Sequence, residues 1–287
     1  MDPIVLVIVV ALLPFGGIER LFGYCGLLML VVVVTAINQT PDWGDVAHGF
    51  VPSLSSSKLY LYFVVGVFSA ALMPYEVHFY SSGAIEEGWD ESSLKENRLN
   101  AIVGYGLGGI LACALVVISG FLFHPLGVEP NDLGTVALPA QNAFGETGLL
   151  LALGGIMFCV GGAAIDSSFS ASYNLAQFLG WEWGRYRGPK RAPRFTASWL
   201  VFLFLAMLIV LSGINPVEIT EYAVVFSVVA LPLTYLPIFL VANDRAYMGT
   251  HVNGRVANLF GLLYLAIIVV VALTAIPLMI LTNGETG

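Results

Sequence analysis

Charged residues are scarce in this chain. Asp, Glu, Lys and Arg make up 10% of its 287 residues, whereas 58% are hydrophobic. Soluble domains carry about 25% charged residues, because their surfaces need polar groups to stay hydrated. The composition therefore excludes an ordinary soluble domain and predicts an all-α polytopic membrane protein with the lipid bilayer as its surroundings. Nothing in the pattern of lysines and arginines indicates a nucleic-acid partner.

Cysteine is also rare, with three residues in the chain. Cys25, Cys113 and Cys159 all lie in apolar runs, so the sequence excludes a disulfide framework and a thiolate metal cluster and predicts three small buried side chains. Catalytic motifs are missing as well: the sequence contains no His-Glu-x-x-His, no Gly-x-Ser-x-Gly and no catalytic cysteine motif. We therefore expect neither an enzyme nor a resident cofactor.

Long apolar runs take up most of the sequence. A bilayer core of about 30 Å needs about 20 mostly apolar residues in a helix. An apolar stretch from Pro3 to Phe15 is too short, and we interpret it as the second half of a helix. Since no low-complexity segment or long linker divides the chain, we predict a single transmembrane transporter domain over residues 1–287. Seven stretches meet or approach the required length: 22–38, 59–81, 99–123, 147–180, 195–213, 217–242 and 257–282.

Positive charges predict the orientation of these spans. All lysines and arginines except Lys58 fall in four alternate connections, at 15–22, 82–98, 181–195 and 243–256. Because cytoplasmic loops of membrane proteins are enriched in Lys and Arg, these four connections should be cytoplasmic. The C-terminus is then predicted to lie outside, and we expect the host to be the cytoplasmic membrane.

A proline interrupts the second of the seven spans. Pro74 lacks the N–H that an α-helix needs and clashes with the preceding turn, so it should free carbonyl groups near Ala70 in mid-membrane. Free carbonyls at that depth are tolerated only inside protein or along a cavity, and broken helices build cation sites in secondary transporters. Met73, Glu76 and His78 stand beside the break. The alternative interpretation is a proline kink whose polar neighbours are hydrated near an interface.

Two more carboxylates lie within predicted spans. Asp166 stands in mid-span, where it indicates either a functional site or a carboxylate capped by neighbouring serine hydroxyls. Glu221 follows Glu218 by one turn near the outer end of its span. These glutamates fit either an acidic vestibule that concentrates cations or a solvated helix N-terminus favoured by the helix dipole. Together with Glu76 and His78, Asp166 and Glu221 are our candidates for a proton relay or cation path.

The residues around Pro74 form a motif that continues along the chain. Met73-Pro74, with Ser81 seven residues after the proline, resembles the broken sixth helix of the Nramp family of proton-coupled divalent-metal transporters. That helix reads Met-Pro-His, then a second histidine five residues on, followed by serine. Four further segments resemble helix ends and loops of the family: Ile18-Glu19-Arg20 with Gly23 and Gly26-Leu27-Leu28, Val51-Pro52-Ser53-Leu54, Asn215-Pro216, and Asn243-Asp244-Arg245 with Met248-Gly249.

The resemblance implies a LeuT-type inverted-repeat fold that lacks its first three helices here, with a partial fourth helix followed by helices five to eleven. It implies transport of a divalent metal such as Mn²⁺ or Fe²⁺, coupled to protons or another cation, by a chain that is a fragment of the transporter. By the same resemblance Met73 supplies a thioether ligand and Ala70 a backbone carbonyl. A soft sulfur ligand favours transition metals over Ca²⁺ and Mg²⁺.

Three departures from the family pattern leave other functions open. The Asp-Pro-Gly-Asn motif of the family's first helix, which supplies further ligands, is absent from the sequence. Tyr75 and Tyr80 replace the two histidines, and Val224 stands where the family has a glutamine. One alternative keeps the fold but carries Mg²⁺ or another cation. The second is a truncated membrane protein without transport activity.

Overall fold

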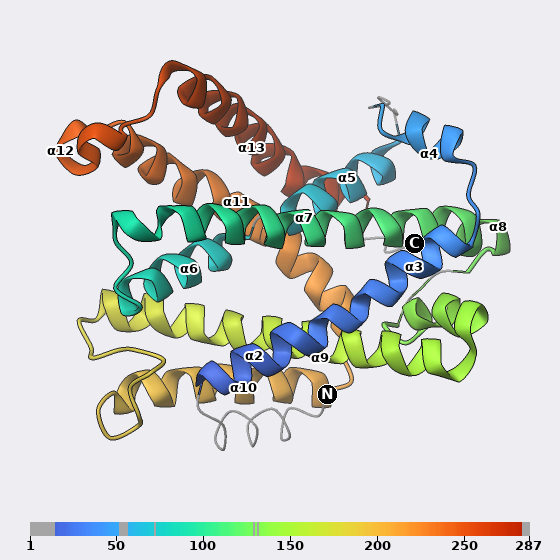
Figure 1. The fold of residues 1–287 in the computed structure, drawn as a ribbon, viewed down its shortest axis with the longest axis horizontal. Coiled ribbons are helices and arrows are strands. Elements are labelled where there is room, and N and C mark those ends of the chain that lie inside the picture. The colour runs from blue at the N-terminus through green and yellow to red at the C-terminus, as the bar shows by residue number, and fades with distance from the viewer. Residues whose placement is uncertain (1–14, 52–56, 72, 129, 131, 283–287) are drawn as a thin grey trace. The chain divides into compact units, whose positions relative to one another are not determined.

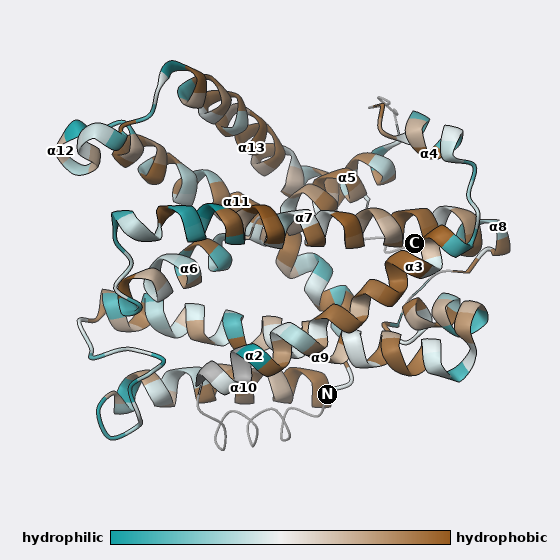
Figure 2. Cartoon of the chain, viewed as in Figure 1, coloured by the Kyte–Doolittle hydropathy of each residue, from teal (hydrophilic) through white to brown (hydrophobic). Residues whose placement is uncertain are grey.

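The computed structural model describes residues 15–51, 57–71, 73–128, 130 and 132–282. Across these ranges all regular secondary structure is helical (Figure 1). Apolar residues run along the long helices, and hydrophilic residues gather in several of the connections (Figure 2). The chain is therefore an all-α polytopic membrane protein, as its composition predicts.

Seven helical segments in the described ranges are long and apolar enough to cross a membrane. Each coincides with one of the seven spans predicted from the sequence. The partial span that begins at Pro3 lies outside the described residues up to residue 14. The LeuT-type repeat arrangement stays a prediction. The seven segments are Arg20–Asn38, Lys58–Glu86, Glu91–Leu126, Thr135–Phe178, Pro193–Leu211, Pro216–Ala242 and Arg255–Leu281.

The predicted connection at 15–22 lies within α2 (Phe15–Gly26). One expectation from the sequence is wrong. Cys113 and Cys159 are exposed rather than buried, and Cys25 is half-buried. Lipid-facing positions of a membrane helix are as apolar as its core, so an apolar run does not tell which of its residues are inside.

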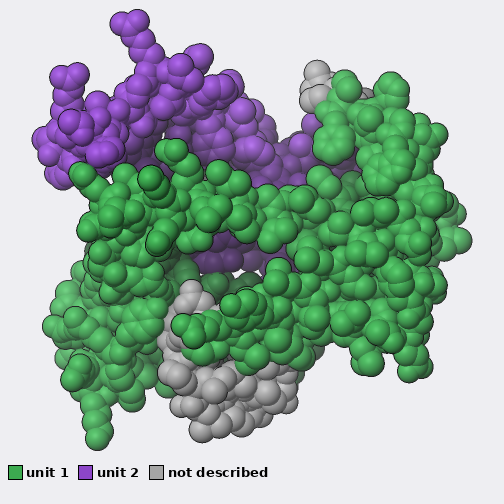
Figure 3. All heavy atoms as spheres, in the orientation of Figure 1, with its two compact units in different colours: residues 1–52, 78–213 green, residues 53–77, 214–287 purple. Residues whose placement is uncertain are grey.

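The chain divides into two compact units (Figure 3). Unit 1 comprises residues 1–52 and 78–213, and unit 2 comprises residues 53–77 and 214–287. The boundary falls inside helix α6 (Pro74–Glu86), so this helix gives its first turn to unit 2 and the remainder to unit 1. A single transporter domain over the whole chain stays a prediction.

Unit 1 is built around the long helix α9 (Leu138–Phe178). Helices α2 and α10 (Pro193–Leu211) pack against α9. Helix α3 (Leu30–Asn38) lies against both α7 (Leu94–Ile118) and α9. A backbone φ of 65° at Gly145 bends α9 near its start, a conformation that favours glycine. The remaining elements of unit 1 are η1 (Leu27–Met29), α4 (Trp43–Gly49), η2 (Glu91–Ser93), η3 (Ser119–Phe123), α8 (His124–Leu126) and η4 (Thr135–Ala137).

Aromatic side chains and a close helix approach hold unit 1 together. Tyr173 and Phe195 are buried with their ring centroids 5.0 Å apart, in the core between α9 and α10. A Cβ at Gly155 would come within 2.6 Å of the Met29 backbone nitrogen. The chain segment at Met29 can therefore approach α9 this closely only because position 155 is glycine.

Unit 2 is a bundle of three long helices, each of which packs against the other two. They are α5 (Lys58–Ala71), α11 (Pro216–Ala242) and α13 (Arg255–Leu281), with α12 (Arg245–Met248) and η5 (Gly249–His251) between the last two. The side chain of Asn215 accepts a hydrogen bond from the Val217 amide at 2.9 Å, and Pro216 is the first helical residue of α11. A side-chain cap followed by proline at the first helical position is a typical helix start.

Candidate metal site at a broken helix

The helix that carries the predicted site is interrupted in unit 2. Helix α5 ends at Ala71 and α6 begins at Pro74, with the half-buried Met73 between them. Since Pro74 has no N–H, it cannot donate to the carbonyl of Ala70 as the fourth residue of an unbroken helix would. The Met73 thioether and the Ala70 carbonyl, which lacks the N–H donor of a regular helix, therefore lie at the same interruption of a membrane span.

Two ionisable candidates follow the interruption on α6. Glu76 lies in the first turn of α6, is half-buried, and its amide donates to the Met73 carbonyl at 3.1 Å. A carboxylate in this first turn faces the positive end of the helix dipole. His78 is also half-buried, and its carbonyl accepts a hydrogen bond from the Ser81 hydroxyl at 3.1 Å. Glu76 belongs to unit 2 and His78 to unit 1.

Glu221 lies on α11 opposite a tyrosine of α5. One of its carboxylate oxygens is buried and has no hydrogen-bond partner among the described residues, and the same holds for the hydroxyl of Tyr62. The Tyr62 hydroxyl and the Glu221 carboxylate face each other and interact, but the two oxygens do not meet the geometry of an ordinary hydrogen bond. Glu218, one turn earlier on α11, interacts with Glu221 by like charge. Glu221 lies close to Pro216, the first residue of α11, and no sequence pattern marks Tyr62 as its neighbour.

Asp166 lies in the middle of α9 and is half-buried. Its neighbour Ser168 donates to carbonyls of its own helix, at 2.9 Å to Ala164 and 2.8 Å to Ile165. Asp166 belongs to unit 1, whereas Met73, Glu76 and Glu221 belong to unit 2. In the described ranges no three His, Cys, Asp or Glu side chains gather closely enough to hold a metal ion. The candidate metal ligands are therefore the Met73 thioether and the Ala70 carbonyl oxygen at the helix break.

The C-terminal end of α6 is held within unit 1 by a polar cluster that no sequence motif predicts. The carboxylate of Glu86 accepts hydrogen bonds from the Tyr173 hydroxyl and, at 3.1 Å, from the Arg185 amide. The Arg185 guanidinium forms an ion pair with Glu87, and its side chain is only 5% exposed. We call Glu86, Glu87, Tyr173 and Arg185 the anchor cluster. It ties α6 to α9 and to the connection between α9 and α10.

Glycine is required beside the anchor cluster. Gly184 has a φ of 144°, and a Cβ there would collide with the Glu86 carboxylate. On α6, a Cβ at Gly83 would lie 3.5 Å from the Arg185 guanidinium, which is ordinary van der Waals contact, so glycine is required at position 184 but not at position 83. One feature of the sequence is consistent with this cluster. The acidic pair Glu86-Glu87 and an arginine-rich stretch lie in two different connections that are both predicted to be cytoplasmic, so their opposite charges can meet.

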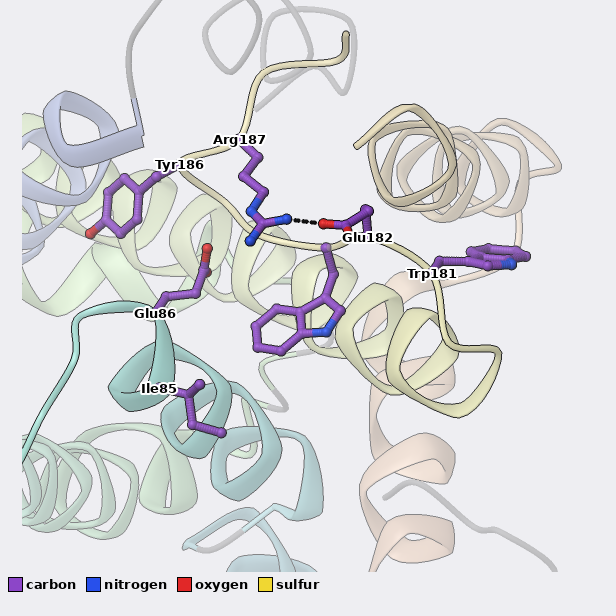
Figure 4. Close-up of a pocket in the computed structure, with 7 residues that line it drawn as sticks. Ile85, Glu86, Trp181, Glu182, Tyr186 and Arg187 are labelled. Atoms are coloured by element: carbon purple, nitrogen blue, oxygen red, sulfur yellow. Dashed lines mark hydrogen bonds and ion pairs between the residues drawn. The ribbon is translucent and has the colours of Figure 1, made fainter. Parts of the chain in front are cut away.

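A cavity of about 540 Å³ opens beside the anchor cluster (Figure 4). Glu182 forms an ion pair with Arg187 across this cavity, drawn as the dashed line in Figure 4. The charges of Glu182 and Arg187 therefore neutralise each other in the cavity lining. The third charged lining residue, Glu86, accepts a hydrogen bond from Tyr173. The cavity has the mixed aromatic and charged lining that is common at a membrane interface. It is lined by Ile85, Glu86, Trp181, Glu182, Trp183, Tyr186 and Arg187.

Comparison with known protein families gives a match along almost the whole chain. A family model described as natural resistance-associated macrophage protein-like, Nramp, matches residues 2–277. The chain belongs to the Nramp family. The matched range contains the helix break and all the candidate site residues, from Ala70 to Glu221. The resemblance seen in the motif around Pro74 is therefore confirmed at the level of the family.

Several curated relatives of this Nramp chain are named divalent metal cation transporter MntH. The protein from Latilactobacillus sakei strain 23K is 24% identical over 87% of the chain, that from Deinococcus radiodurans 26% over 90%, and that from Staphylococcus saprophyticus 24% over 94%. The matched regions span 58%, 57% and 64% of the three relatives, respectively. The chain thus covers less than two thirds of the length of these relatives.

Proposed function

We propose that this Nramp chain serves the passage of a divalent metal cation across a membrane and that its broken helix binds the cation. The observation that carries the proposal is the interruption between Ala71 and Pro74, with Met73 inside it. Three relatives are named divalent metal cation transporters. A soft thioether favours a transition metal of the Mn²⁺ or Fe²⁺ type.

In this proposal Met73 and the Ala70 carbonyl are the ligands, and the metal is cargo rather than a resident cofactor. Glu76, His78, Asp166 and Glu221 are the candidates for a cation path or for a proton relay that couples movement of the metal to protons. The chain performs transport rather than enzymatic chemistry. We place it in the cytoplasmic membrane with the C-terminus outside, because its lysines and arginines cluster in alternate connections.

The test is metal binding by the purified chain in lipid nanodiscs. Isothermal titration with Mn²⁺ and with Mg²⁺ should show preference for Mn²⁺ in the natural sequence. Met73→Ala should weaken Mn²⁺ binding by about tenfold or more, equal to about 1.4 kcal/mol, and leave Mg²⁺ binding nearly unchanged. The matched control is Met207→Ala, since Met207 is also half-buried but lies inside the unbroken helix α10.

The outcomes separate the open functions. A Mn²⁺ preference that survives Met73→Ala contradicts the thioether ligand and favours a harder cargo such as Mg²⁺. Absence of binding for every divalent metal contradicts the proposed function and favours a membrane protein without transport activity. An equal loss in the Met73→Ala and Met207→Ala chains would show that general destabilisation, rather than ligand removal, lowers the affinity.

A further inference from the structure

Two buried oxygen atoms without hydrogen-bond partners face each other in unit 2. Tyr62 on α5 is 1% exposed, and its hydroxyl finds no partner among the described residues. One carboxylate oxygen of Glu221 on α11 is equally buried and unpartnered. Buried polar atoms are almost always hydrogen-bonded, and these two face each other, so one hydrogen bond between the phenol and the carboxyl group would satisfy both.

Tyr62 belongs to the apolar core of unit 2, together with aliphatic side chains such as Val65 and Val225. Glu221 is half-buried as a residue, and the carboxylate oxygen without a partner is the enclosed one. A carboxylate in such surroundings is penalised unless it is paired, and taking up a proton removes the penalty. The protonated carboxyl group also gains a donor, which the unpartnered phenol oxygen can accept.

Few charged groups face the pair. On α11, Glu218 and Tyr222 are its electrostatic neighbours. On α5, Lys58 lies one turn before Tyr62 and is exposed. On α13, residues 256–281 include no charged side chain. The titratable Tyr264 of that helix packs instead against Phe68 and Tyr235. The negative charge of Glu218 thus lies near Glu221, and Lys58 on α5 is exposed.

We propose that Tyr62 and Glu221 form a proton-binding site, in which the Glu221 carboxylate takes up one proton and shares it with the phenol oxygen of Tyr62. No bond other than the O–H bond on Glu221 forms or breaks. Tyr62 precedes Ala70 by eight residues on α5, so the site lies about 12 Å along the helix from the proposed metal ligand. Its use in transport rests on the proposed function, whereas proton binding itself does not.

Infrared titration of the purified chain in lipid nanodiscs tests this site. The natural sequence should show the carbonyl absorption of a protonated carboxylic acid at a pH where exposed carboxyl groups are ionised. Glu221→Gln should abolish that absorption, whereas Glu218→Gln, one turn away on the same helix, should retain it. Tyr62→Phe should shift the pH midpoint of the absorption, because the phenol can no longer take part in the hydrogen bond.

Two results would overturn the proposal. One is an absorption that persists unchanged in Glu221→Gln, which would place the protonated group elsewhere. The other is stoichiometric loss of the absorption on adding Mn²⁺ at constant pH, which would make the pair a metal site. Thermal melting of each variant guards against misfolding, and the isosteric Tyr62→Phe change keeps the core packed. Failure of Mn²⁺ binding at Met73 would leave these spectra unchanged, so the two proposals fail separately.

Discussion

The hydroxyl of Tyr173 donates a hydrogen bond to the carboxylate of Glu86, 87 positions earlier in the chain. Tyr173 is fully buried in the aromatic core of unit 1, so its hydroxyl has a fixed position. The Arg185 amide donates to the same carboxylate at 3.1 Å. The end of α6 that follows the helix break is therefore held by a buried, directional contact rather than by apolar packing alone.

Replacing the buried phenol tests how strongly this contact holds α6. Tyr173→Phe keeps the ring and its packing but leaves the Glu86 carboxylate without one donor, which should cost about 1–3 kcal/mol of unfolding free energy. The control is Tyr186→Phe, because the Tyr186 hydroxyl donates to Glu87 at 3.2 Å in an exposed setting. We expect the control to cost no more than about 0.5 kcal/mol. Equal losses in reversible unfolding in detergent would contradict a special role for Tyr173.

Glycine at position 184 should be irreplaceable beside the anchor cluster. Gly184→Ala places a Cβ in a left-handed backbone conformation and against the Glu86 carboxylate. We expect a loss of about 1–3 kcal/mol in unfolding free energy. Gly188→Ala in the same connection is the matched control, since a Cβ there meets no atom within 4 Å. If both variants unfold at the same denaturant concentration as the natural chain, this connection tolerates a rearrangement that the structure does not show.

The positions of the spans followed from the sequence because the bilayer imposes a simple demand. Every backbone polar group in the apolar core must be bonded within a helix, so the length of each apolar run gives the length of each span. The helix break before Pro74 was predictable for a similar reason, because proline has no backbone N–H to donate in any fold. Asn215 and Pro216 are typical of a helix start, because the Asn215 side chain caps the helix and proline is tolerated at its first position.

The contacts between distant segments did not follow from the sequence. The partner of Glu86 is Tyr173, and no local pattern joins two positions that far apart. In the sequence, Tyr62 is one of several aromatic residues in an apolar run, and nothing distinguishes it from the others. Only the packing of α5 against α11 places it opposite Glu221. The burial of cysteines was mispredicted for a related reason, because lipid and protein core select the same apolar residues.

The connection between α6 and α7 should respond to acid through Asp90. Hydrogen bonds from the Ser92 hydroxyl and amide lower the pKa of Asp90, which caps the turn that leads into α7. A lowered pKa in the folded state means that the stabilisation is present above the unfolded value of about 3.9 and is lost as the pH falls through the folded pKa. The melting temperature of Asp90→Ala should therefore approach that of the natural chain as the pH falls below about 4.

Asp90→Asn separates the charge from the cap. The amide oxygen of asparagine still accepts hydrogen bonds at a helix start but does not titrate in this range. The difference in melting temperature between Asp90→Asn and the natural chain should then be small and should shrink further in acid. A difference between Asp90→Ala and the natural chain that stays constant from about pH 7 to about pH 3 would show that the Asp90 charge does not stabilise the turn.

Restoring a donor at the helix break should separate stability from metal binding. Pro74→Ala returns an N–H that can bond to the Ala70 carbonyl, and it removes the ring that clashes with the preceding turn. We expect the melting temperature to stay the same or rise, whereas Mn²⁺ affinity falls because the carbonyl is now occupied. Pro277→Ala is the control, since Pro277 lies within the continuous helix α13 of the same unit. Unchanged affinity in Pro74→Ala would mean that the break binds metal without the Ala70 carbonyl, whereas an equal loss in both variants would point to altered packing of unit 2.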